Sequence, residues 1–491
     1  MITVVGMDGS PLGPQAQAAL ASAALVAGAR RHLAAVPALT ASPVPAPAGA
    51  AQAHGTHGVR TLVLGELAPA LDALAACDGD AVVLASGDPG FFGIVRALRE
   101  RGLPCTVLPA VSSVAMAFAR VGLPWDDAAV VSAHGRDPRP ALSVCRAHPK
   151  VAVLTGPGCG PAEIGAALAG WARRLVVCEH LGSGAERVTE CSPADAAARS
   201  WEDPNVVLIL AGPPKPADPL ASPAPTGTSA QQTAPAPALA PGQLSWLWQQ
   251  RHSYAGVATT TTNQPGRTRA LEGDAGLVGP VGPGLGWALG EEQFDSRDAV
   301  ITKAEVRALA LARLGPGPGM LVWDVGAGSG SVGIECARFG AAVIAVERDA
   351  VRCERVRANA TRHGVDVRIV AGAAPEALGK LPDPDAVFVG GGGPEVVEAV
   401  TARHPARIVV ALAAVERAGL ATAALAAAGY VTGGALVQAA RFAPLPSGAH
   451  RLAAINPVFL VWGALPGTTE SVSARDHDGQ GNRGTGPGAL R

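Results

Sequence analysis

The chain has 491 residues, of which 48% are hydrophobic and 16% are charged, and its formal net charge at pH 7 is −1. This length predicts two or three domains, each able to bury a hydrophobic core. The balanced charge argues against a protein that holds nucleic acid through its phosphates, because such proteins carry a basic excess. The eight cysteines include no CxxC pair, so the sequence predicts neither a metal site nor a disulfide framework.

The N-terminal residues, MITVVGMDGS, lack the charged segment of a signal peptide and enter a strand-like apolar run at once. Longer apolar segments are rich in alanine and interrupted by Gly, Pro or Arg, so we expect no membrane span. Scattered cysteines are typical of a reducing compartment. These features together predict a cytoplasmic protein.

Short apolar runs alternate with helical segments over residues 1–211. This alternation predicts an α/β domain with a largely parallel sheet. One of its helices is expected at residues 16–27, where alanine is frequent. Because ligands of such domains bind at the carboxyl ends of strands, the Gly, Ser, Asp and Pro residues that follow the apolar runs predict a ligand site.

Five segments of this domain follow its expected strands in order: VVGMDG, VVLASGDPGFFG, VLPAVSS, VSAHGRD and VLTGPGCGP. They resemble the tetrapyrrole methylase family, and within it the branch that methylates a corrin precursor at carbon 5 in cobalamin synthesis. The resemblance implies two small α/β lobes that hold one S-adenosylmethionine. The cofactor contacts that it implies are Gly87, Asp88, Ser112, Ser113 and Thr155.

Single motifs of this set have other interpretations. An SGDPG segment alone is a plausible turn, because Gly and Pro set its backbone angles, and His134 alone could be an ordinary surface or core histidine. The order of the five segments favours the family. In one respect the chain departs from it, because Met7 and Asp8 separate Gly6 from Gly9 where relatives often have a fuller glycine run, and we expect this loop to face the macrocycle.

Residues 212–283 are rich in Pro, Ala, Ser and Thr and cannot bury enough apolar area to offset the entropy of the chain, so they predict an extended linker. Trp246 and Trp248 interrupt this composition, and they either dock onto a domain or form a short amphipathic turn. Residues 467–491 predict a disordered tail. The second domain is therefore expected at residues 284–466.

Within that domain, a strand-like run at 321–325, the turn GAGSG, a helical run at 331–339 and a second apolar run at 342–346 predict a βαβ unit. Glycines allow positive φ angles and close approach of a ligand to the backbone. Glu347 follows about twenty residues later, where such folds use a carboxylate to hold ribose hydroxyls. Asp324 before the turn could accept from an ammonium group or orient the loop.

DVGAGSG resembles motif I of the class I methyltransferases that use S-adenosylmethionine, and the alternative is a Rossmann-like unit with no ligand or with a nicotinamide. The wider set ITKAEVRALALARL, WDVGAGSGSVGIECAR, VERD, GAAPEAL and VFVGGGG resembles the decarboxylating carbon-15 methyltransferases of the same pathway. The resemblance implies a seven-stranded, Rossmann-like α/β domain with its own S-adenosylmethionine. The expected cofactor contacts are Thr302, Asp324, Gly326, Ala327, Gly328, Ser329, Gly330, Glu347 and Ala374.

Two local details of this domain lead to further expectations. Thr302 followed by Glu305 has the spacing of a capping box at the start of a helix. Relatives usually have an acid at the position of Ala373, which would bond the adenine, so we expect cofactor binding to be weaker by about 1–2 kcal/mol.

Together the resemblances imply a bifunctional corrin methyltransferase that converts precorrin-6B to precorrin-8x, with methylation at carbons 5 and 15 and loss of the carbon-12 acetate as carbon dioxide. Methyl transfer mainly requires an in-line approach and exclusion of water. Because the substrate bears many carboxylates, basic side chains are the expected clamps. The candidates are Arg136, Arg139, Arg297, Lys303, Arg441 and Arg451.

The resemblance to tetrapyrrole methylases implies a dimer, and that of the carbon-15 unit implies a tetramer, so we expect a homo-oligomer. The expected partner molecule is a tetrapyrrole, and we expect no nucleic acid or membrane partner. Two alternatives stay open at this point. One is a nucleic-acid methyltransferase, which the net charge disfavours. The other is a chain in which only one half is catalytic and the other half is a binding scaffold.

Overall fold

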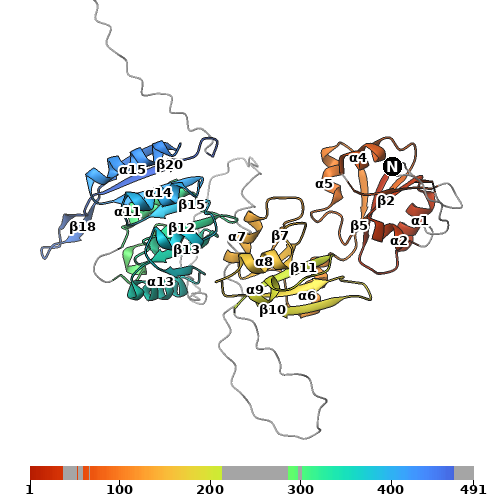
Figure 1. Cartoon of the computed structure of the whole chain (residues 1–491), viewed down its shortest axis with the longest axis horizontal. Coiled ribbons are helices and arrows are strands. Elements are labelled where there is room, and N and C mark those ends of the chain that lie inside the picture. The colour runs from red at the N-terminus through yellow and green to blue at the C-terminus, as the bar shows by residue number, and fades with distance from the viewer. Residues whose placement is uncertain (37–51, 54–58, 66, 213–285, 297–300, 469–491) are drawn as a thin grey trace, which may run out of the picture. The chain divides into compact units, whose positions relative to one another are not determined.

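The structure is a computed structural model that describes residues 1–36, 52–53, 59–65, 67–212, 286–296 and 301–468 (Figure 1). The chain divides into two compact units, Met1–Gly282 and Pro283–Arg491. The expected linker, its two tryptophans and the expected tail lie outside the described residues, apart from a few residues at their ends. The domain boundaries inferred from the sequence therefore stay a prediction.

The first unit begins with a lobe whose described strands form a sheet in the order β3-β4-β2-β5-β1-β6. All neighbours in it are parallel except the short β3–β4 pair. Its strands are β1 (Ile2–Met7), β2 (Leu25–Gly28), β3 (Gln52–Ala53), β4 (Arg60–Val63), β5 (Ala81–Ser86) and β6 (Cys105–Leu108), and its helices are α1 (Pro14–Ser22), α2 (Arg30–Ala34), α4 (Leu67–Ala75) and α5 (Ile94–Glu100).

Apolar residues on both faces of this sheet are buried. Val4 of β1 packs in one cluster and Val5 in another, because successive side chains of a strand point to opposite faces. Helices therefore cover both faces, as a parallel sheet requires.

The expected helix at residues 16–27 is wrong in its second half. Helix α1 ends at Ser22, and Leu25–Gly28 forms β2, which is buried between β4 and β5. Alanine favours a helix locally, but pairing on both sides and complete burial favour a strand at this position.

The second lobe has a sheet in the order β10-β9-β11-β8-β7, in which only β7 and β8 are parallel. The expectation of a largely parallel sheet is therefore wrong for this lobe, although the two-lobed α/β class is confirmed. Its elements are β7 (Ala129–Ser132), β8 (Lys150–Leu154), β9 (Arg173–Glu179), β10 (Arg187–Cys191), β11 (Asn205–Ala211), α6 (Ser113–Val121), α7 (Arg139–Ala147), α8 (Pro161–Ala167) and α9 (Pro193–Ala197).

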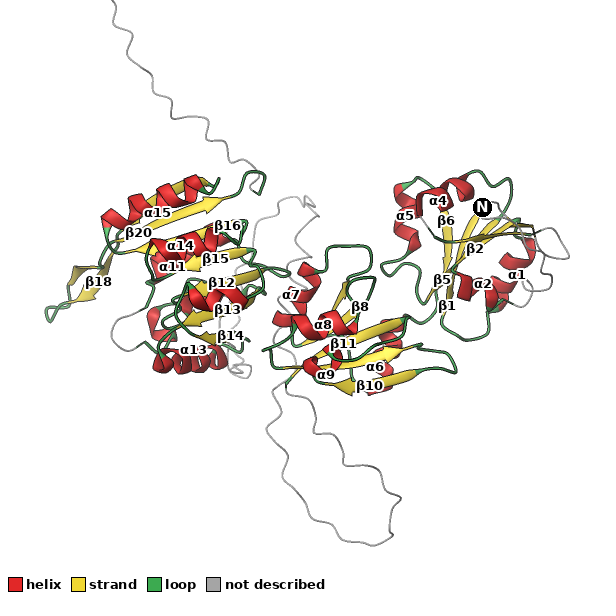
Figure 2. Ribbon diagram, viewed as in Figure 1, coloured by secondary structure: helices red, strands yellow, loops and turns green. Residues whose placement is uncertain are grey.

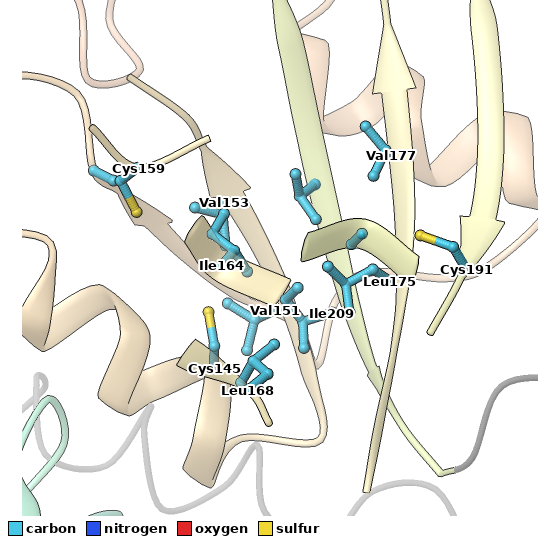
Figure 3. Close-up of a cluster of buried hydrophobic side chains, with 13 residues drawn as sticks. Cys145, Val151, Val153, Cys159, Ile164, Leu168, Leu175, Val177, Cys191 and Ile209 are labelled. Atoms are coloured by element: carbon cyan, nitrogen blue, oxygen red, sulfur yellow. The ribbon is translucent and has the colours of Figure 1, made fainter. Parts of the chain in front are cut away.

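One face of this sheet packs against α7, α8 and α9 through a cluster that includes Cys145 and Ile164 (Figure 3). The opposite face packs against α6 through Val114 and Phe118. Helix α6 follows the last strand of the first lobe, so it carries the chain directly from one core to the next.

The second unit contains a sheet in the order β14-β13-β12-β15-β16-β20-β17, parallel except at β20 (Figure 2). This order is the seven-stranded class I arrangement, which confirms the fold expected from the sequence. The strands are β12 (Leu321–Val325), β13 (Ala342–Glu347), β14 (Arg368–Ala371), β15 (Ala386–Val389), β16 (Arg407–Leu412), β17 (Val431–Val437) and β20 (Val458–Ala464), and β18 (Ala440–Pro444) and β19 (His450–Ala454) form a separate hairpin. The helices are η1 (Glu291–Gln293), α11 (Ala304–Leu314), α12 (Ser331–Arg338), α13 (Ala350–Arg362), η2 (Glu376–Lys380), α14 (Pro394–Thr401) and α15 (Val415–Ala427).

A fully buried ion pair between Arg307 of α11 and Glu335 of α12 lies near the start of the second unit. The Arg307 Nε–H donates to Glu335 at 2.6 Å, and both side chains are 0% exposed. Glu335 also accepts the backbone N–H groups of Ala288 and Leu289, and Arg307 donates to the carbonyl oxygen of Thr302. The pair therefore ties the segment before α11 to the helix that follows the glycine turn.

Replacing Arg307 by Met leaves the Glu335 carboxylate buried without its charged partner, which is costly. We expect the free energy of unfolding of the second unit to fall by about 3–5 kcal/mol. Proteolysis in urea, with peptides of this unit quantified by mass spectrometry, measures the change. Arg417→Met, at an exposed position of α15, is the matched control and should shift stability by less than about 0.5 kcal/mol. Equal shifts in the two variants would contradict the role of the pair.

Candidate functional site

The strand order of the first lobe is of the kind that opens a crevice at the carboxyl ends of β1 and β5. The chain leaves β1 through α1 toward β2 on one side, whereas it leaves β5 through α5 toward β6 on the other. Adjacent strands whose connections leave in opposite directions open a crevice at their carboxyl ends, and ligands of α/β sheets bind there.

Backbone segments approach one another closely around this crevice. A methyl group added at Gly6 would lie 2.2 Å from the carbonyl oxygen of Gly87 and 2.5 Å from the backbone nitrogen of Ala110. A methyl group at Gly87, where φ is +57°, would lie 3.1 Å from Cα of Ser112 and 3.2 Å from the nitrogen of Ser113. The structure therefore brings together three of the expected cofactor contacts, Gly87, Ser112 and Ser113.

The side chains of the remaining expected contacts are held by the protein. Asp88 follows Gly87 and accepts the N–H of Gly90 at 2.8 Å. Thr155 follows β8 in the second lobe, and its hydroxyl lies 2.7 Å from the carbonyl oxygen and 2.8 Å from Oδ1 of Asn205. The hydroxyl of Ser112 accepts the N–H of Ala115 and caps α6. Asp88 thus belongs to the same loop as Gly87, whereas Thr155 belongs to the other lobe and bonds a residue of that lobe.

The loop with Met7 and Asp8, where the sequence departs from its family, connects the two lobes. The Asp8 carboxylate accepts N–H groups from Ser10 at 2.9 Å and from Val111 at 3.2 Å, and these bonds lower its pKa. A methyl group at Gly9 would lie 2.0 Å from the carbonyl oxygen of Gly182 in the second lobe. The sequence analysis did not predict these contacts of Asp8 and Gly9, because a single aspartate in a loop does not indicate its distant partner.

Two of the proposed substrate clamps lie after β7. The Arg136 guanidinium lies 5.8 Å from the ring centroid of Phe92, a non-glycine residue with φ of +55° in the SGDPGFFG loop. Arg139 donates to Asp137 of its own loop at 2.7–3.1 Å. Arg136 therefore faces the loop of the expected cofactor site, whereas Arg139 already has a protein carboxylate as its partner.

In the second unit, the glycine turn lies between two buried carboxylates. Gly326, Gly328 and Gly330 all have positive φ, at 74°, 59° and 77°. Glu347 accepts the N–H of Gly328 at 2.9 Å, and Asp324 accepts the N–H of Gly333 at 2.8 Å. Asp324 therefore bonds the first turn of α12, and burial raises its pKa to about 7.

The first two residues of the turn are accessible. Gly326 is exposed and Ala327 half-buried, while residues 328–330 are buried beneath them. A methyl group at Gly326 would lie 3.0 Å from the nitrogen of Gly391 in the neighbouring glycine run. Each Glu347 oxygen accepts one protein N–H, from Gly328 and from Asp349, and keeps a second lone pair for a hydroxyl group.

Two of the remaining cofactor candidates, Ser329 and Thr302, have backbone carbonyl groups that bond other parts of the protein. The carbonyl oxygen of Ser329 accepts from Asn359 at 2.9 Å, and that of Thr302 accepts from Arg307 at 2.6 Å. Ala374 is half-buried and precedes a cis peptide bond to Pro375. Asn359, which also bonds the backbone of Asp295, was missed because a buried polar residue in a helix has no local sequence signature.

The capping box expected at Thr302 and Glu305 is wrong. Helix α11 starts at Ala304 with Lys303 as its N-cap, and no side chain of the cap position bonds the helix. Instead, the Ala304 N–H donates to Glu291, which comes from the preceding segment, at 2.8 Å. A carboxylate from outside the helix has taken the place of the local cap.

Arg441 of β18 binds two protein carboxylates, those of Glu291 and Glu305, at 2.6–2.9 Å. The pairing lowers the pKa of Glu291 to about 2 and raises that of Arg441. A substrate carboxylate would have to displace one of these partners before Arg441 could bind it.

The other proposed clamps of this unit differ in their surroundings. Lys303 is half-buried at the start of α11, and Arg451 is exposed on β19. Arg297 lies outside the described residues.

Comparison with known proteins assigns both units. Residues 5–197 match the family model of Tetrapyrrole (Corrin/Porphyrin) Methylases, and residues 292–459 match that of the Precorrin methyltransferase domain. A precorrin-6Y C(5,15)-methyltransferase [decarboxylating] of Sinorhizobium sp is 33% identical over 410 residues, which cover 80% of this chain and 79% of that protein. The chain belongs to the precorrin-6Y C(5,15)-methyltransferase (decarboxylating) family.

Two further relatives support this family. A precorrin-6Y C(5,15)-methyltransferase [decarboxylating] of Mycobacterium tuberculosis is 30% identical over 349 residues, 69% of this chain and 71% of that protein. A cobalt-precorrin-7 C(5)-methyltransferase of Salmonella typhimurium is 33% identical over 221 residues, 43% of this chain and 98% of that protein. The family inferred from the sequence motifs is therefore confirmed, and with it the use of S-adenosylmethionine by methyltransferase domains of these families.

Glu347→Gln removes the charge of the carboxylate that faces the glycine turn of this precorrin-6Y methyltransferase. We expect the affinity of one class of S-adenosylmethionine sites to fall on the order of tenfold, because hydrogen bonds to charged groups contribute about 1.5–3 kcal/mol. Isothermal titration calorimetry of the whole chain measures it. Glu416→Gln, at an exposed position of α15, is the matched control. Unchanged affinity in the Glu347 variant would exclude this carboxylate from the cofactor site.

The raised pKa of Asp324 predicts a pH effect on stability. Its folded pKa of about 7 lies above the ordinary value of 3.8, so the folded state holds a proton that the unfolded state has lost. Asp324 should therefore destabilise the second unit progressively as the pH rises from about 4 to about 7. Asp324→Asn keeps the acceptor for Gly333 and removes this titration. Urea unfolding at several pH values should show the variant gaining on the wild type over that range, and parallel curves would contradict the assignment.

Proposed function

We propose that this chain methylates precorrin-6B at carbons 5 and 15 and removes the carbon-12 acetate as carbon dioxide, which yields precorrin-8x in cobalamin biosynthesis. The first unit acts at carbon 5, and the second unit acts at carbon 15 and in the decarboxylation. Each unit binds its own S-adenosylmethionine. The observation that carries this proposal is the match of two different methyltransferase families to two separate units, each with a glycine turn of positive φ after a central strand.

The division of labour is supported by the relatives. The Salmonella C(5)-methyltransferase aligns over 98% of its own length with less than half of this chain, so carbon-5 methylation needs only one of the two units. The precorrin-6Y relatives, which carry both activities in their name, align with most of the chain. The decarboxylating unit is then the second, which matches the precorrin methyltransferase domain.

S-adenosylmethionine supplies an activated, electrophilic methyl group. In the second unit the glycine turn lets the backbone approach the cofactor, and Glu347 presents free lone pairs to ribose hydroxyls. Gly390–Gly393 lies against the turn, where the lack of side chains leaves room for a flat substrate. In the first unit, Gly87 and the start of α6 at Ser112 and Ser113 present backbone groups in the same way.

We also propose that the protein is a homo-oligomer and that it works in the cytoplasm. The hairpin β18–β19 pairs Phe442 with Leu452, and these side chains are 80% and 65% exposed. Exposed apolar surface of this kind is typical of interaction sites. The cysteines are all free, as in proteins of a reducing compartment. In the part of the chain that the structure describes, no helix is long and apolar enough to cross a membrane.

Mass spectrometry of the product formed from precorrin-6B and S-adenosylmethionine tests the proposal. The wild type should add two methyl groups and lose one carbon dioxide. Gly87→Val should keep one methyl addition and the carbon dioxide loss, because the new side chain meets Ser112 and strains a positive φ. Gly326→Val should keep one methyl addition without that loss.

Gly184→Val and Gly317→Val are the matched controls, since a Cβ atom at either position meets no atom within 4 Å and neither glycine has a positive φ. They should behave as the wild type. If one half is only a scaffold, the wild type itself adds a single methyl group. No methylation of any corrin precursor would refute the proposed function.

A further inference from the structure

A cluster of three side chains lies beside the crevice of the first lobe and takes no part in the contacts described so far. Arg31 and His32 belong to α2, which follows β2, and Ser86 is the last residue of the neighbouring strand β5. Ser86 directly precedes Gly87 and Asp88, and it pairs with Met7 at the end of β1. The cluster therefore borders the expected cofactor loop on the side of β2.

The three side chains form a closed hydrogen-bonded triangle. The Arg31 Nη2–H donates to Ser86 Oγ at 2.9 Å, and the Arg31 Nε–H donates to His32 Nε2 at 3.3 Å. Ser86 Oγ lies 3.0 Å from the same His32 nitrogen. Because donors reach Nε2 from two sides, this nitrogen is the unprotonated one, and the serine hydroxyl both accepts from Arg31 and donates to His32.

His32 serves in this triangle as a neutral acceptor. Its side chain is only 9% exposed, and burial together with the nearby Arg31 charge lowers its pKa. The imidazole therefore orients the guanidinium without adding charge of its own. Ser86 is likewise neutral, so both groups fix the direction of Arg31 and neither neutralises it.

Arg31 itself is exposed and has no carboxylate partner among the residues that the structure describes. In this respect Arg31 differs from Arg139 and Arg441, whose guanidinium groups bind protein carboxylates. Within the described residues, no ion pair occupies its remaining N–H donors, which can bind an anion.

We propose that Arg31 binds a peripheral carboxylate of the tetrapyrrole substrate in the first unit, with Ser86 and His32 as the residues that position it. This inference rests on the proposed function, because that function supplies a substrate rich in carboxylates. A guanidinium held by two neutral acceptors presents a planar fork, which suits bidentate binding of a carboxylate. Since Ser86 and Gly87 are consecutive, one strand end sets the position of both the substrate anchor and the cofactor loop.

The kinetics of carbon-5 methylation test the anchor. In Arg31→Gln the apparent KM for the corrin substrate of this step should rise on the order of 10- to 100-fold, because a charge-assisted bond pair is lost. The S-adenosylmethionine affinity and kcat should change little. Arg60→Gln removes the same charge at the opposite, amino-terminal edge of this sheet and is the matched control.

For His32 and Ser86, the test needs a measurement that would stay unchanged if these residues only stabilised the fold. The KM for the corrin substrate is such a measurement. His32→Leu should raise the same KM. His32→Gln offers an amide oxygen as acceptor, so its KM should stay much closer to the wild-type value. Ser86→Ala should raise KM less than Arg31→Gln, because one of the two acceptors remains. Equal KM values in Arg31→Gln and Arg60→Gln would overturn the proposal. It would also be overturned if cofactor affinity and thermal stability fell as KM rose, because the substitution would then have damaged the fold.

Binding of uroporphyrin, a stable tetrapyrrole polycarboxylate, separates this proposal from the proposed function. Titration of the full chain without S-adenosylmethionine, followed by the absorbance of the porphyrin, should show weaker binding to Arg31→Gln than to Arg60→Gln. If the wild type methylates no corrin precursor but this difference persists, the proposed reaction fails and the anchor stands. If the wild type methylates precorrin-6B and the two variants bind and react alike, only the anchor is wrong.

Discussion

The close approach of backbone to backbone at the ends of the central strands is the constraint on which both units depend. Gly6 meets Gly87 and Ala110 in the first unit, and Gly326 meets Gly391 in the second, at distances that leave no room for a Cβ atom or almost none. Where the loops come this close, a side chain would separate them. The two folds differ in sheet order and strand direction, yet both bring their loops together through the same absence of side chains.

Carboxylates then hold these loops, and each unit does so in its own way. In the first unit, Asp8 is half-buried and bonds the backbone N–H groups of its own loop at Ser10 and of the distant Val111. In the second, Asp324 and Glu347 are buried on either side of the glycine turn. A buried carboxylate is costly unless hydrogen bonds compensate it, and for Asp324 that cost is expressed as a raised pKa. The loops of the second unit are therefore held by buried carboxylates, whereas in the first unit the loop at Asp8 and Gly9 also contacts the other lobe.

Much of this architecture could be predicted from the sequence, and the failures share one cause. Glycine turns after apolar runs identified Gly87 and Gly326–Gly330, because these signals are local. The strand at Leu25–Gly28 was missed, since only its pairing partners make it a strand. Glu305 looked like part of a helix cap but pairs with Arg441, which is far away in the chain. Likewise, no local pattern shows that Arg31 bonds neutral partners and Arg139 a carboxylate, since partners depend on the fold.

The triad of Arg441 with Glu291 and Glu305 connects the exposed hairpin β18–β19 to the start of α11. Arg441 lies on the exposed hairpin, while Glu291 also holds the first N–H of α11, next to Thr302. A displacement at the base of the hairpin must therefore change the start of that helix. If the cofactor binds next to this helix start, as proposed, a ligand of the hairpin and the cofactor would change each other's affinity by the same factor. The coupling would then pass through three charged side chains.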